Sequence, residues 1–135
     1  MSEKAIEYSL EDLEIYYDDF DFGKYLRAVR QAKGVSIRQL AKDVNKTPTY
    51  LSDIENGHNK PPDKELLEKI ISELHIEDYP NLKNRFFDLA GRERNDIPAD
   101  VKDYIMSNQA LLKIIRTAKD RPNSEQIWSQ IAKTI

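Results

Sequence analysis

The sequence predicts an all-α fold, and three features of its composition and pattern support this. Glycine and proline are scarce, with 4 and 6 among the 135 residues, whereas leucine, isoleucine, lysine and glutamate are plentiful. Apolar residues recur at the three- and four-residue spacing of amphipathic helices along most of the chain. No run of alternating β-branched residues indicates a strand. We therefore expect short helices joined by turns and loops.

Residues 1–21 form an acidic N-terminal arm that nevertheless has a helical pattern of apolar residues. The arm holds eight acidic residues against a single lysine, which gives it a net charge of −7. Ser9 is a suitable N-cap for a short helix, with Asp12 in its first turn. The apolar residues at helical spacing are Ile6, Leu10, Leu13, Tyr16, Tyr17 and Phe20. One interpretation is that they pack against the next helix.

That next helix is expected over about 21–33. Phe22, Leu26 and Val29 recur on one helical face, so they are expected to point into the core. Gly34 follows directly and is a typical C-terminal stop.

Residues 34–57 are the most informative segment, because they predict two short helices joined by a tight turn. Ser36 is a suitable N-cap for the first helix, and Gln39 three residues later completes a capping box. Leu40 and Val44 then share one helical face, four residues apart. The first helix of the pair is therefore expected to end close to Val44.

The turn and the second helix of this segment are marked by residue type. Asn45 tolerates the left-handed backbone conformation that a sharp turn requires. Thr47 and Pro48 then provide an N-cap and a first helical residue, Leu51 points inward, and Gly57 ends the helix. Two helices of about eight residues, joined by three or four, form a helix-turn-helix whose second helix suits the DNA major groove.

The chain beyond this motif keeps its helical periodicity. A loop precedes a helix with a wide apolar face, which is typical of a core helix. Helices are expected at about 63–74, 80–90, 98–106, 108–118 and from 122 to the end. Gly91 is expected to end the second of these, and residues 92–96 to form a polar linker.

The region 22–75 resembles the Cro and phage-repressor family of regulators, often called Xre. The resemblance is carried by Phe22 to Ser36, by Tyr50 to Gly57, and by the pairs Pro61-Pro62 and Leu66-Leu67. It implies a repressor-type DNA-binding domain of five helices that contains the helix-turn-helix, followed by a small helical C-terminal extension.

The resemblance also implies a structural ion pair. In this family an arginine of the first helix pairs with the glutamate that ends the recognition helix, and the matching residues are Arg30 and Glu55. A buried pair of this kind holds geometry more than it adds stability. The sequence departs from the family pattern at Asn45, which is usually glycine, and at Lys46, which is usually apolar. Neither change breaks the turn.

Base-reading residues follow from the same resemblance, because the N-terminal end of a recognition helix enters the major groove first. The matching positions are Thr47, Pro48, Thr49, Tyr50, Ser52 and Asp53. Thr49 and Ser52 can hydrogen-bond several bases, and Asp53 can accept from N4 of cytosine. Tyr50 either reaches the DNA or flanks the core. The set lacks a bidentate arginine or glutamine, so direct readout is expected to be modest.

The distribution of charge indicates where phosphates are held. Residues 22–60 hold eight basic against three acidic residues, a net charge of +5, whereas residues 61–135 are close to neutral. The local field, rather than the overall charge of −3, decides attraction to a polyanion. The expected phosphate contacts are Ser36, Arg38, Lys42, Lys46, Asn56, Asn59 and Lys60. Ser36 lies at a helix N-terminus, where backbone N–H groups favour anions.

Residues 76–135 are expected to form a helical region that mediates dimerisation. The segments 87–91 and 96–100, with Tyr104 and Ile105, are similar to the C-terminal part of Xre-type regulators carried on phages and conjugative elements. Such regulators usually bind paired half-sites. Two alternatives are a helical extension that packs on the DNA-binding domain and a pocket for a small-molecule effector.

Several functional classes are disfavoured. With no cysteine there is neither a disulfide nor a thiolate metal site, consistent with a reducing cytoplasm. Only two histidines are present, His58 and His75, and no catalytic or phosphate-binding motif accompanies them. No apolar run is long enough to span a bilayer. We therefore expect a cytoplasmic protein that is not an enzyme and needs no cofactor or metal.

The sequence as a whole predicts a dimeric transcriptional repressor that binds double-stranded DNA at a palindromic operator. On this hypothesis the acidic arm, docked in cis or on a partner subunit, moderates DNA affinity by its charge. The competing hypothesis is a protein-binding antitoxin, immunity or anti-defence factor, in which the helical domain serves a protein partner.

Overall fold

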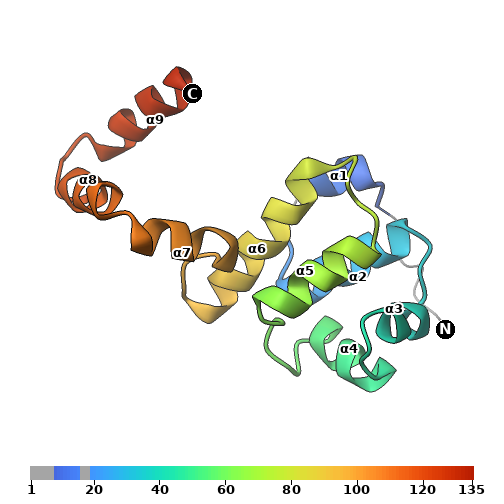
Figure 1. Cartoon of the computed structure of the whole chain (residues 1–135). Coiled ribbons are helices and arrows are strands. Elements are labelled where there is room, and N and C mark those ends of the chain that lie inside the picture. Colours follow the sequence, from blue (N-terminus) through green and yellow to red (C-terminus); the bar gives the residue numbers. More distant parts are fainter. Residues whose placement is uncertain (1–7, 16–18) are drawn as a thin grey trace. The chain divides into compact units, whose positions relative to one another are not determined.

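The computed structural model describes residues 8–15 and 19–135, and every regular element within these ranges is a helix (Figure 1). The all-α prediction is therefore confirmed. The helices are α1 Leu10–Ile15, α2 Phe22–Ala32, α3 Ile37–Asp43, α4 Pro48–Glu55, α5 Lys64–Glu73, α6 Pro80–Arg94, α7 Ala99–Ser107, α8 Gln109–Lys119 and α9 Ser124–Thr134. The chain forms two compact units, Met1–Asp100 and Val101–Ile135.

The core of the first unit is built around α2, which packs against α1, α4 and α6. Phe22 and Tyr25 of α2 are buried, and both rings meet Phe86 of α6 edge to face, with centroids 5.9 and 4.9 Å apart. Edge-to-face aromatic pairs add stability beyond their burial. The unit that holds the helix-turn-helix therefore extends past residue 75, the boundary expected from the sequence, because α6 supplies part of its core.

The helix-turn-helix segment folds as its local signals indicate. Leu40 and Val44 of α3 and Leu51 of α4 are buried, and α3 packs directly against α4. Asn45 has φ of 58° and Gly57 has φ of 77°, so both occupy the left-handed region in which asparagine and glycine are tolerated.

The capping box expected at the start of α3 is only half formed, so this prediction was partly wrong. Ser36 Oγ accepts a hydrogen bond from the Gln39 backbone N–H at 3.0 Å. The Gln39 side chain does not return to Ser36, because its Nε2 donates to Asp43 Oδ1 one helical turn later, at 2.8 Å.

The prediction that this helix ends at Gly91 was wrong, and so was the prediction of a polar linker over residues 92–96. The helix continues to Arg94 and ends at Asn95, which has φ of 51°. Gly91 instead allows a close approach, since a Cβ there would lie 3.0 Å from Asp96 O and 3.1 Å from Pro98 N. The glycine therefore serves packing against the returning chain, not termination.

The described part of the arm packs in cis on α2 and α6. Ser9 Oγ accepts from the Asp12 N–H at 3.1 Å, as expected of a cap. Leu13 is fully buried, and its carbonyl oxygen accepts from Tyr25 Oη at 2.8 Å. The other apolar positions expected in this helix include Ile6, Tyr16 and Tyr17, which lie outside the described residues.

Glu11 and Glu14 of α1 bind the start of α6. Tyr79 Oη donates to Glu11 Oε1 at 3.0 Å, and the Asn81 N–H donates to Glu14 Oε1 at 3.4 Å. Tyr79 is the N-cap of α6, but its side chain does not cap the helix. A carboxylate from α1 therefore meets one of the N–H groups that an uncapped helix leaves unsatisfied.

The second unit contains α8, α9 and the part of α7 from Val101 onward. Ala118 is its single buried residue, and α8 packs on α9. Large apolar side chains stay exposed, among them Tyr104, Met106 and Ile114 at 67%, 58% and 52%. Across residues 8–15 and 19–135, no helix is both long and apolar enough to cross a membrane.

Candidate nucleic-acid interface

Helix α4 presents its N-terminal end at the surface of the first unit. Thr47 Oγ1 accepts from the Tyr50 N–H at 3.1 Å, which makes Thr47 the N-cap, and Pro48 is the first helical residue. Thr47, Pro48 and Thr49 are exposed, whereas Leu51 and Ile54 are buried beneath them. The α3–α4 pair lies at one edge of the unit (Figure 1), and no described residue of the first unit covers the leading end of α4.

The far end of α4 is held by a buried ion pair. Arg30 Nε and Nη2 donate to Glu55 Oε2 and Oε1 at 2.7 and 2.8 Å. The side chain of Glu55 is 1% exposed and that of Arg30 is 12% exposed. Arg30 Nη1 also donates to Val35 O at 3.0 Å. This single guanidinium therefore joins α2, α4 and the turn before α3.

A second arginine, Arg27, binds the same carboxylate and was not foreseen from the sequence. Its Nε lies 3.3 Å from Glu55 Oε1, and its Nη2 donates to Asn56 Oδ1. Asn56 Nδ2 in turn donates to Ser52 Oγ at 3.3 Å. A signal was available, because Arg27 lies three residues before Arg30 and so shares its helical face. The network therefore includes Ser52 and Asn56, two of the predicted DNA-contact residues.

The other predicted base-reading residues differ in exposure and partners. Tyr50 is half-buried, and Lys46 Nζ lies 5.3 Å from the centre of its ring, within range of a cation–π interaction. Asp53 is half-exposed, with His58 Nδ1 3.9 Å from its Oδ1. The His58 backbone N–H donates to the Asp53 carbonyl at 2.8 Å. These contacts hold the loop after α4 close to the helix.

All seven predicted phosphate contacts are exposed, and they lie around α3 and the ends of α4. The side chains of Ser36 and Asn56 already have hydrogen-bond partners in the protein, the Gln39 backbone N–H and the Arg27 guanidinium. Asn59 and Lys60 border a hollow of about 600 Å³ that also involves Glu93 and Arg94 of α6. Arg94 could not be predicted from the sequence, because only the fold brings it beside Pro61, whose carbonyl accepts from its Nη2.

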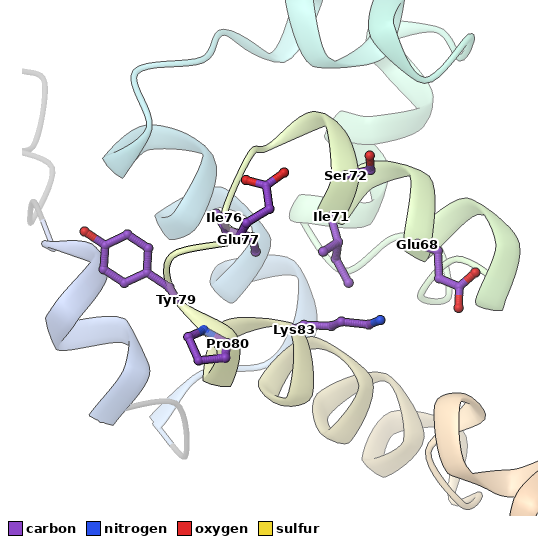
Figure 2. Close-up of a pocket in the computed structure, with 8 residues that line it drawn as sticks. All are labelled: Glu68, Ile71, Ser72, Ile76, Glu77, Tyr79, Pro80 and Lys83. Carbon is purple, nitrogen blue, oxygen red and sulfur yellow. The ribbon is translucent and has the colours of Figure 1, made fainter.

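A second hollow of the first unit, about 380 Å³, lies between α5 and the start of α6 (Figure 2). Ile71, Ile76 and Pro80 contribute apolar surface, and Glu68 and Lys83 contribute charge. No residue of α3 or α4 lines it. In the described ranges, no three His, Cys, Asp or Glu side chains gather closely enough to hold a metal ion.

Two helices packed across a tight turn, with the second exposing its capped N-terminus, define a helix-turn-helix domain, the kind of domain with which many regulators bind DNA. Residues 26–77 match the family model described as Helix-turn-helix. The chain therefore contains an Xre-type helix-turn-helix domain, as its resemblance to the Cro and phage-repressor family implied.

The chain is similar to the HTH-type transcriptional regulator SlrR of Bacillus subtilis (strain 168). The two are 38% identical over 55 residues, which cover 41% of this chain and 36% of SlrR. The similar region thus spans just over a third of that relative. No solved structure matches the chain.

Proposed function

We propose that this protein is a transcription regulator that binds a palindromic operator as a homodimer and represses by occupying a promoter. The single observation that carries the proposal is the exposed N-terminal end of α4. Thr47, Pro48 and Thr49 stand free of the core, while the opposite end of the helix is fixed by Arg30 and Glu55. A recognition helix needs both an accessible tip and a rigid support.

Within this proposal, recognition of bases and of phosphates is divided between different residues. Thr49, Ser52 and Asp53 face the major groove and read base edges. The exposed cations around α3 and the loop after α4 hold the DNA backbone, which fixes position without reading sequence. The net charge of +5 in residues 22–60 favours the approach of a polyanion.

The proposed dimer is supported by the second unit. A unit with Ala118 as its single buried residue cannot bury enough apolar surface to be stable by itself. Its exposed Tyr104, Met106 and Ile114 suit a second copy of the same surface, as in a two-fold dimer. Two such subunits would place their α4 helices on half-sites about 34 Å apart, one turn of DNA.

A selection of DNA from a random pool with the full-length protein tests the proposal. We expect an inverted repeat with half-site centres separated by about 10 base pairs. Affinity for the selected site is expected to fall steeply between about 50 and 200 mM salt, because bound phosphates release counterions. Sedimentation of the protein–DNA complex should give two chains per site. Absence of any binding to duplex DNA at low salt would refute the proposal.

The exposed apolar surface of the second unit also suits the competing hypothesis, in which the chain binds a different protein as an antitoxin, immunity or anti-defence factor. The oligomeric state and the DNA binding of the isolated protein distinguish the two hypotheses. A chain that stays monomeric at high micromolar concentration and selects no DNA would favour a different partner.

A further inference from the structure

A series of hydrogen bonds links α2 to the second half of α4, and it bears on base recognition if the proposed function holds. The first hydrogen bond joins Arg27 of α2 to Asn56, and the second joins Asn56 to Ser52 of α4. An arginine side chain has only N–H donors. The oxygen of the Asn56 amide must therefore face Arg27, as it does in the structure.

The direction of the second bond follows from the first. With its oxygen on Arg27, Asn56 turns its NH₂ group toward Ser52 Oγ, 3.3 Å away. The amide nitrogen can only donate, so Ser52 Oγ is the acceptor in this bond. The hydroxyl proton of Ser52 is left for another partner.

That proton has no acceptor within the part of the chain that the structure describes. A serine inside a helix often donates to the carbonyl four residues earlier, and Thr117 and Thr134 do so here at 3.0 Å. Ser52 makes no such bond, and it lies half-exposed on α4. Its O–H is therefore available to a ligand.

We propose that Arg27, acting through Asn56, keeps the hydroxyl proton of Ser52 free to donate a hydrogen bond to DNA. A donor favours base edges that carry an acceptor in the major groove, which are N7 and O6 of guanine, N7 of adenine and O4 of thymine, over cytosine, which presents only its amino group. Arg27 is a positioning residue, and Ser52 is the residue that sets specificity.

The position of Arg27 is itself well determined. Its Nε lies 3.3 Å from Glu55 Oε1, and Glu55 is held on its other side by Arg30 at 2.7 Å. The contacts of Arg27 with Glu55 and with Asn56 together fix the orientation of its guanidinium plane. The neighbouring Asp53 offers only acceptors while it is ionised, so adjacent residues of α4 present opposite polarity.

The test compares the bases selected from a random DNA pool by full-length wild type and by three variants. Ser52→Ala should abolish a discrimination of about tenfold against cytosine at one position of each half-site. Arg27→Met, which removes the donors, should weaken the same discrimination because the amide is then free to turn over. In Asn56→Asp both oxygens accept, so Ser52 donates to the protein, and the preference should shift toward cytosine.

A double variant separates this role from a purely structural one. In the Ser52→Ala background, adding Arg27→Met should leave base preference at that position unchanged, whereas a general loss of helix support would weaken binding to all sequences. Arg27→Lys, which can still donate to Asn56, should restore part of the preference.

Three results overturn the inference. Wild type that selects no sequence refutes the proposed function and this inference with it. A selected operator whose base preference survives Ser52→Ala refutes the inference alone. So does an Arg27→Met effect on base preference that persists without the serine hydroxyl.

Discussion

Replacing Arg30 by methionine tests whether the buried ion pair holds α4 in place. The change leaves Glu55 in a site where its side chain is 1% exposed, with Arg27 Nε at 3.3 Å as its remaining cation. Breaking a buried pair by removing one partner typically costs about 3 to 5 kcal/mol. Because Arg27 still compensates part of the charge, we expect about 3 kcal/mol of lost unfolding free energy.

Urea unfolding followed by circular dichroism measures this loss, and two comparisons make it specific. Arg27→Met removes a longer contact from a side chain that is 40% exposed, so it should cost about 1 kcal/mol or less. The double variant Arg30→Met with Glu55→Leu removes both buried charges and should recover most of the stability. A loss below about 1 kcal/mol for Arg30→Met alone would show that the pair does not hold the helix.

Three further predictions concern packing, pH and DNA contacts. Gly91→Ala should lower the free energy of unfolding in urea by about 1 to 3 kcal/mol, because the added Cβ meets the backbone of Asp96 and Pro98. An increase in stability would show that the higher helix propensity of alanine outweighs this contact. Burial and the nearby Asp100 raise the pKa of Asp88, so its folded form binds the proton more tightly and unfolding free energy falls as pH rises through the acid range. Asp88→Asn should flatten that part of the pH profile, and an unchanged profile would contradict it. Lys60→Ala should weaken operator and random DNA alike, whereas Thr49→Ala with Ser52→Ala should erode discrimination in competition binding; equal losses on both DNAs would contradict this division.

The helix-turn-helix was predictable because its signals are local. Thr47 caps an N–H three residues away, and Asn45 adopts a positive φ that few residue types tolerate. Such preferences depend on neighbours within one turn, so the printed sequence contains them. The pairing of Arg30 with Glu55 came from family resemblance, since nothing local relates two residues on different helices.

The remaining contacts are set by the fold and have no local signal. At the N-terminus of α2 the N-cap is Asp21, but a second carboxylate comes from α6, where Glu93 Oε1 accepts from the Phe22 N–H at 2.8 Å. Gly91 was taken for a helix stop because glycine often has that role, whereas here tertiary packing requires its missing side chain. Both contacts involve the last turns of α6 and depend on how the chain folds back on itself.

The position of α1 bears on the role of the acidic arm. Its main neighbours are α2 and α6, not α3 and α4, and two of its carboxylates bind Tyr79 and the start of α6. These contacts support the interpretation in which the arm packs in cis and completes the core through Leu13. Any effect of the α1 carboxylates on DNA affinity would then act through their field over a distance. Because a screening length is about 10 Å at 0.1 M salt, such an effect would be confined to low ionic strength.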